Sequence, residues 1–123
     1  LRIAAVKGNV QMVVLMLEAG ADVNAVAEDG GTALQLAASY KHEGVVDLLL
    51  DICSGAGVDV NAVNDISDTA LSCAVLRGYE NFVKLLLDRG ADWKVGRNPL
   101  TIAVSRQHLN IARELLNRGA RPG

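Results

Sequence analysis

The chain has 123 residues, and half of them are hydrophobic, which suffices for the core of one compact domain. Only four side chains are aromatic, so the sequence offers little for stacking bases or flat cofactors. Twelve basic against 14 acidic side chains leave a net charge of −2, which argues against a general attraction to nucleic acid or anionic membranes. The longest apolar run, residues 12–17, is too short to span a bilayer.

The charge is unevenly distributed along the chain. Residues 1–62 carry three Lys or Arg and eight Asp or Glu, whereas residues 63–123 carry nine and six. The first half is therefore acidic and the second basic.

Cys53 and Cys73 are the only cysteines and form no CxxC pair. Free thiols favour a reducing compartment, so we expect an intracellular protein, cytoplasmic or nuclear.

In chain order, one pattern recurs four times. A short apolar stretch at residues 1–5, 34–38, 71–75 and 100–104 is followed about ten residues later by a second one, at 12–17, 45–50, 82–87 and 111–116. We predict two antiparallel helices per unit. Thr32 and Thr69 are expected to cap first helices, and glycines such as Gly20 to end second helices. A polar, turn-rich segment that fits an extended hairpin then leads to the next unit.

These units resemble the ankyrin repeat, whose recurring text is Thr-Pro-Leu-His-x-Ala-Ala followed by Gly-Ala-Asp-Val-Asn. Residues 32–38, 69–71 and 98–100 match the first phrase, and residues 20–24 match the second. The resemblance covers essentially the whole chain. It implies an all-α solenoid, in which stacked helix-turn-helix pairs are joined by β-hairpin-like loops. We expect one array over 1–123, with repeats at about 1–25, 26–62, 63–92 and 93–123.

The spacing departs from the regular period in the middle of the array. Leu1 to Leu34 spans 33 residues, Leu34 to Leu71 spans 37, and Leu71 to Leu100 spans 29. The extra residues, around 52–56, form either one more helical turn or a longer loop. The loop at 92–98 is shortened. The first repeat lacks its hairpin and cap, so its outer apolar face is either exposed or covered by residues before Leu1. Glu114, which replaces a column of leucines, fits a terminal repeat.

The residue types of an active site are present but form no recognisable catalytic arrangement in the sequence. His42 and His108 follow inter-helix turns two repeats apart, so we expect them to bond backbone groups rather than share a metal. Cys73 shares a column with Ile3, Leu36 and Ile102 and is predicted to lie in the core. Asp22, Asp59 and Asp92 recur as turn residues, while Asn24 and Asn61 are expected to bond across their hairpins. We expect no enzyme, cofactor or metal.

The resemblance implies that first helices and hairpin tips line a concave surface that binds other proteins. Residues in the columns that do not repeat are the candidates for binding, because stacking does not need them. Tyr40, Leu76 and Ile66 are apolar there, which suits interface anchors; alternatively, Leu76 packs on the next helix and Ile66 lies on its loop. The predicted protein-binding residues are Lys7, Glu28, Asp29, Ser39, Tyr40, Asp65, Ile66, Asp68, Leu76, Arg77, Lys94, Arg97, Ser105 and Arg106.

The sequence thus predicts a non-catalytic protein–protein interaction module or scaffold, monomeric and part of a larger intracellular protein. The partner would be another protein or peptide segment, with no nucleic acid and no membrane. The acidic first half and basic second half suit a partner with basic and acidic blocks in matching order. The alternative is a structural spacer or regulatory array that acts on other domains of its own chain.

Overall fold

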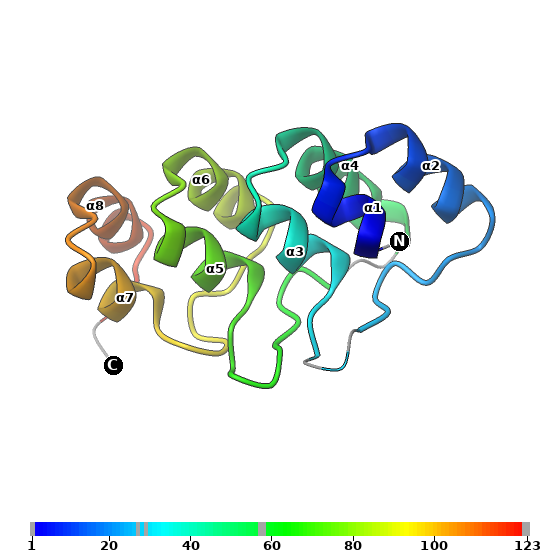
Figure 1. Ribbon diagram of the computed structural model, residues 1–123. Coiled ribbons are helices and arrows are strands. Elements are labelled where there is room, and N and C mark those ends of the chain that lie inside the picture. Colours follow the sequence, from blue (N-terminus) through cyan, green and yellow to red (C-terminus); the bar gives the residue numbers. More distant parts are fainter. Residues whose placement is uncertain (1, 27, 29, 57–58, 122–123) are drawn as a thin grey trace.

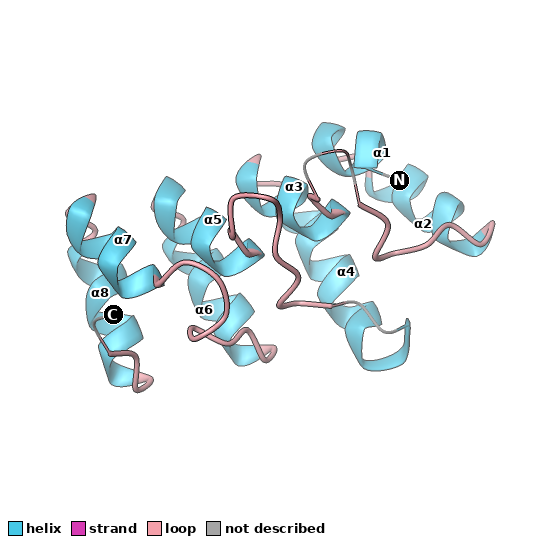
Figure 2. Cartoon of the chain, turned by 90° about the horizontal axis from the view of Figure 1, so that it is seen from below, coloured by secondary structure: helices cyan, strands magenta, loops and turns pink. Residues whose placement is uncertain are grey.

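A computed structural model describes residues 2–26, 28, 30–56 and 59–121, with only the backbone described for 51–56. Within these residues the chain forms helices and no strands, so the expected hairpins are loops with turns. The helices form four antiparallel pairs stacked side by side, with the termini at opposite ends (Figures 1 and 2). They are α1 (Arg2–Lys7), α2 (Val10–Glu18), α3 (Ala33–Ser39), α4 (Glu43–Ala56), α5 (Ala70–Arg77), α6 (Glu80–Asp88), α7 (Pro99–Ser105) and α8 (Leu109–Asn117).

The first helices begin where the sequence predicts, because side chains satisfy their free backbone N–H groups. Thr32 accepts from the Gln35 backbone and Thr69 from the Ser72 backbone, and each pair closes a reciprocal capping box. Asn98 caps α7, with Pro99 at the first helical position. The caps predicted at Thr32 and Thr69 are confirmed.

The second helices differ in length at the place where the spacing is irregular. α4 runs over 14 residues, against nine for α2, α6 and α8. The extra residues therefore lengthen the helix by about one turn, which decides between the two alternatives that the sequence leaves open. The loop from 89 to 98, which precedes α7, is the shortest of the connections between pairs. Gly20, Gly90 and Gly119 follow the other second helices with positive φ, as predicted.

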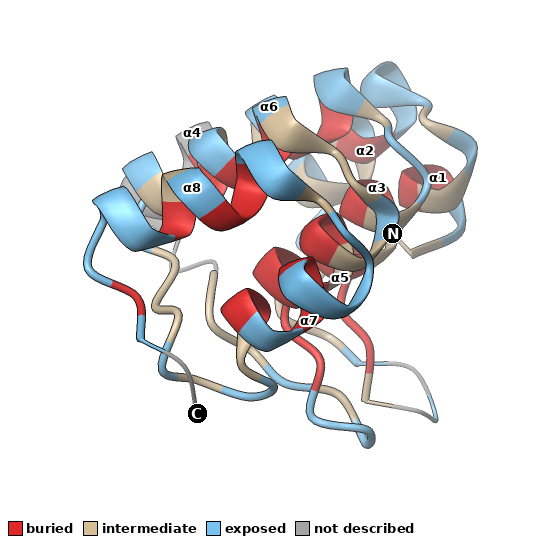
Figure 3. Ribbon diagram, turned by 90° about the vertical axis from the view of Figure 1, so that its left-hand side faces the viewer, coloured by how far each residue is buried: buried red, intermediate tan, exposed pale blue. Residues whose placement is uncertain are grey.

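The core lies between a layer of first helices and a layer of second helices (Figure 3). Leu49, Leu86 and Leu115 occupy one column of the second helices and are fully buried. α5 packs against both α3 and α7, so this internal first helix is enclosed on both sides. Single pairs could not bury their apolar sides, and stacking supplies the missing contacts.

The prediction that the repeat position shared by Ile3, Leu36, Cys73 and Ile102 lies in the core is wrong in part. Ile3 is 75% exposed, and Leu36 and Cys73 are only half-buried, whereas Ile102 is buried. This column lies at the edge of the first helices, where a residue meets the neighbouring helix on one side and solvent on the other. Burial there depends on the neighbouring repeat rather than on the residue's own apolar character.

Asparagines connect the loops of successive repeats. The Asp59 backbone N–H donates to Asn24 Oδ1 over 2.8 Å, and the Asp92 N–H donates to Asn61 Oδ1 over 2.7 Å. Asn61 Nδ2 also donates to the Gly90 carbonyl over 3.3 Å. Both asparagines thus bond to the loop of the next repeat, beyond the hairpins across which the sequence predicts their bonds. Asp22, Asp59 and Asp92 accept from the backbone two residues on, as expected of turn residues.

Candidate functional site

His42, Tyr79 and His108 occupy the same position in three successive repeats, directly after the turn between the paired helices. His42 Nε2 donates to the Val6 carbonyl of the preceding repeat, as predicted for a structural imidazole. A methyl group on Gly8 would lie 2.5 Å from the His42 ring, and one on Gly78 would lie 2.9 Å from the His108 ring. Glycine at these turns therefore leaves room for the histidine of the next repeat.

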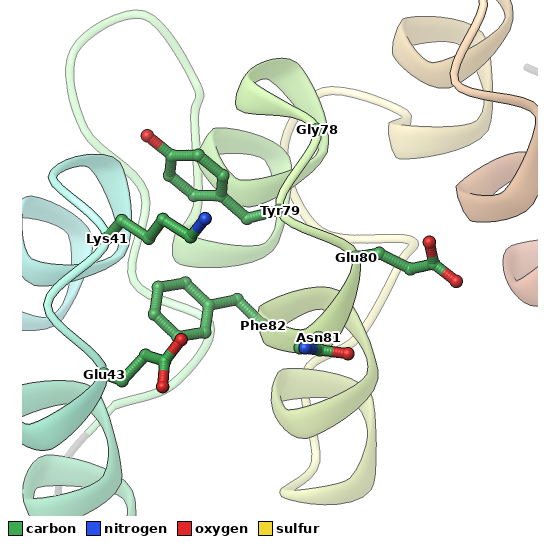
Figure 4. Close-up of a pocket in the computed structure, with 7 residues that line it drawn as sticks. All are labelled: Lys41, Glu43, Gly78, Tyr79, Glu80, Asn81 and Phe82. Carbon is green, nitrogen blue, oxygen red and sulfur yellow. The ribbon is translucent and has the colours of Figure 1, made fainter.

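Between the second and third repeats, Lys41 and Tyr79 stand where the other repeats have glycine and histidine. Lys41 Nζ lies 5.4 Å from the centroid of the Tyr79 ring, which stands edge-on to Phe82 at 5.9 Å. The Tyr79 hydroxyl donates to the Ser39 carbonyl over 3.4 Å. Figure 4 shows these side chains lining a pocket of about 210 Å³, with Glu80 pointing away from them. Tyr79 thus contacts Lys41 and Ser39 of the preceding repeat, so we assign this pocket a structural role.

A second pocket lies between α5 and α7 and brings predicted binding residues together. Its volume is about 300 Å³, and it extends along α7 from Arg97, in the preceding loop, to Arg106, at the end of the helix. Leu76 reaches it from α5. We call it the α5–α7 pocket, and its lining is Leu76, Arg97, Asn98, Thr101, Ile102, Ser105 and Arg106.

Asp68 fixes the position of one side of this pocket. Its carboxylate lies 3.2 Å from Arg97 Nη1 and accepts from the Ser72 hydroxyl over 3.1 Å. The Arg97 backbone N–H also donates to the Ser67 carbonyl over 2.9 Å. Asp68 is only 4% exposed. Asp68 was predicted to lie at the surface, but the structure buries it, because its carboxylate bonds to Arg97 and Ser72.

Gln35 extends this polar network to the second repeat. It is buried, and its Nε2 donates to the carbonyls of Ala62 over 2.7 Å and Asp68 over 3.1 Å. Its Oε1 accepts from the Thr32 N–H over 3.0 Å. One side chain thus caps its own helix and supports the next loop. Gln35 was not among the candidates predicted from the sequence. The signal that could have found it is a polar residue on the buried face of α3, three positions after a capping Thr.

The other predicted binding residues are spread over the array. Tyr40 and Ile66 are 55% and 66% exposed, and the Tyr40 ring stacks on His42 with centroids 6.4 Å apart. Leu76 is half-buried and packs on the core while it lines the pocket. Asp29 lies outside the described residues. Ser39 is half-buried, and the remaining predicted residues are exposed: Lys7, Glu28, Asp65, Arg77, Lys94, Ser105 and Arg106.

Both ends of the stack expose apolar side chains. Val104 is 64% exposed, although Val75, at the same place in the preceding repeat, has no exposed area. Val104 and Leu116 line a pocket of about 370 Å³ at one end, and Ile3 and Met12 line one of about 330 Å³ at the other. Val104 and Met12 correspond to positions that a neighbouring repeat covers inside the array.

The described residues contain no cluster of three or more His, Cys, Asp or Glu side chains that could coordinate a metal. Nor does this part of the chain include a helix long and apolar enough to cross a membrane. Burial raises the pKa of the Cys73 thiol, which lowers its thiolate fraction at neutral pH.

Comparison with known proteins agrees with the fold. A family model described as ankyrin repeats (3 copies) matches residues 1–95 and 52–123, so its matches span the whole chain. A search of curated proteins found no match. The repeat resemblance stated from the sequence is confirmed, together with the all-helical stack.

Proposed function

The chain belongs to the ankyrin repeat family, whose members are generally protein–protein interaction modules, and we propose that it is a non-catalytic module that binds another protein. The binding surface consists of the exposed sides of α1, α3, α5 and α7 together with the loop tips, which project from the same edge of the stack (Figures 1 and 3). We call it the concave surface. The module acts inside the cell, as part of a larger protein.

The exposure of Tyr40 and Ile66 carries this proposal. Each residue leaves more than half of its side chain in solvent, and neither is needed to pack one repeat against the next. Large apolar groups that a stable fold leaves uncovered, among charged neighbours such as Lys41 and Asp65, are typical of interface anchors. Association would need little rearrangement, because the loops are joined by hydrogen bonds.

The test compares three immobilised baits in quantitative affinity capture from cell lysate. They are the wild-type chain, a Tyr40→Ala/Ile66→Ala variant, and a Leu15→Ala/Leu109→Ala control that removes equally exposed side chains from the second helices. Circular dichroism melts establish that all three fold. We expect a protein that the wild type and the control retain and the Tyr40→Ala/Ile66→Ala variant loses. Equal capture by all three baits, or none by any, would refute the concave surface.

The exposed apolar ends favour a second candidate, the structural spacer. Val104 and Met12 are exposed where internal repeats bury the corresponding positions, so other parts of the same protein could stack there. A spacer would respond to deletion of a repeat and tolerate Tyr40→Ala/Ile66→Ala. The same three baits therefore separate the two functions.

A further inference from the structure

The α5–α7 pocket has the size of a site for one or two side chains. Its volume, about 300 Å³, is at the lower limit of small-molecule sites, which range from about 300 to 1,000 Å³. The apolar part of its lining consists of Leu76 and Ile102, and Ile102 is buried. An aliphatic side chain, or one aromatic ring, would bury its surface against these two residues. The remaining lining is polar and lies on α7 and the loop before it.

The surroundings of this pocket are basic. Arg97 is paired with Asp68. Arg77 and Arg106 are exposed and make no ion pair with any described residue. Arg97 and Arg106 thus line the pocket, and Arg77 directly follows the pocket residue Leu76 on α5.

Four acidic side chains in this half of the chain have partners outside the pocket. Glu80 pairs with Lys84 on α6, and both Asp88 and Glu114 pair with Arg118. The Asp92 carboxylate accepts from the Lys94 backbone. Lys84 and Arg118 are therefore paired with acids of the second helices, whereas Arg77 and Arg106 of the first-helix layer have no such pair among the described residues and are left for an outside partner.

We propose that the α5–α7 pocket binds an acidic peptide segment of the partner protein. An aliphatic or aromatic side chain of the segment seats on Leu76 and Ile102, and carboxylates beside it in the segment reach Arg77 and Arg106. Arg97 is already held by Asp68 and lines the pocket where the preceding loop meets α7. Guanidinium–carboxylate hydrogen bonds are about twice as strong as neutral ones, and they fix the orientation of the segment. This proposal rests on the proposed function, of which it specifies the partner.

The test selects peptides from a random display library against the wild-type chain. We expect enriched sequences in which an aliphatic or aromatic residue has Asp or Glu within two positions. Synthetic copies of these peptides are then measured by fluorescence anisotropy against Arg106→Glu and against Arg113→Glu. Arg113 is exposed on α8, so the second variant makes the same charge change on the second helix of the same repeat. We expect Arg106→Glu to weaken binding at least about tenfold and Arg113→Glu to change it less than about twofold.

Each other outcome overturns a stated part of the reasoning. Peptides without acids, or binding that Arg106→Glu leaves unchanged, would overturn the proposed partner chemistry. If those peptides are instead lost with Tyr40→Ala/Ile66→Ala, the concave surface remains and only the pocket assignment is wrong. Acidic peptides without an apolar residue would show attraction by charge alone and overturn the pocket. If no peptide is enriched, this proposal is overturned, and the lysate capture then decides whether the proposed function falls with it.

Discussion

Replacing Gln35 by Ala tests whether one buried amide joins two repeats. The substitution removes three hydrogen bonds: one from the Thr32 N–H to Oε1 at 3.0 Å, and two from Nε2, to Ala62 at 2.7 Å and Asp68 at 3.1 Å. A typical protein hydrogen bond contributes about 0.5–1.5 kcal/mol net, and a buried group left unpaired costs about 1–3 kcal/mol. Because Gln35 is buried, we expect Gln35→Ala to lower the free energy of unfolding by about 2–4 kcal/mol.

Urea unfolding followed by far-UV circular dichroism measures this loss. Gln11→Ala is the matched control, because Gln11 is exposed on α2 and makes no hydrogen bond through its side chain in the described structure; it should change stability by less than about 0.5 kcal/mol. Gln35→His adds an intermediate case. A neutral imidazole can accept from Thr32 and donate once, so one of the three bonds is lost.

Hydrogen exchange gives the local readout for the same variant. Gln35→Ala should raise exchange in the loop that carries Ala62 and Asp68 more than in α8, because only the loop loses its support. A loss of stability below about 0.5 kcal/mol, or exchange that rises equally in both segments, would refute the role assigned to Gln35.

Two further substitutions with internal controls test the packing. Leu86→Ala should cost about 2–5 kcal/mol, because Leu86 is fully buried, whereas Leu36→Ala, at a half-buried position, should cost less than half as much in urea unfolding. Gly78→Ala should cost more than Gly90→Ala: both have positive φ, for which a non-glycine residue pays about 1–2 kcal/mol, but only the Gly78 methyl would also meet His108, at 2.9 Å. Equal costs in either comparison would contradict the packing described.

The local features of the fold could be predicted from the sequence because their causes are local. Thr32 and Thr69 cap helices through backbone groups three residues away, and Gly20 ends α2 through its own φ. The length of α4 needed the structure, since four extra residues suit a helical turn as well as a loop. The same applies to the edge column, where Leu36 is covered only as far as its neighbours reach.

The candidate site was harder to predict, because it joins residues far apart in the sequence. The sequence places Leu76, Arg97 and Arg106 in non-repeating columns, but it does not indicate that they line one pocket. Asp68 is a polar loop residue and was therefore expected at the surface. Its partner Arg97 lies 29 residues away, and only the stacked arrangement brings the two together.

The loops of the concave surface are fixed before any partner arrives. Gln35 supports the loop of the third repeat at Asp68, the Asp68 carboxylate pairs with Arg97 of the fourth, and Asn61 bonds the backbone at Asp92. Ordering a mobile side chain on binding costs about 0.5–1.5 kcal/mol, and a surface ordered in advance avoids that cost. Gln35 should therefore matter for binding although it is buried and contacts no partner. A partner recognised by shape and charge would lose affinity when this support is removed, even with every contact residue intact.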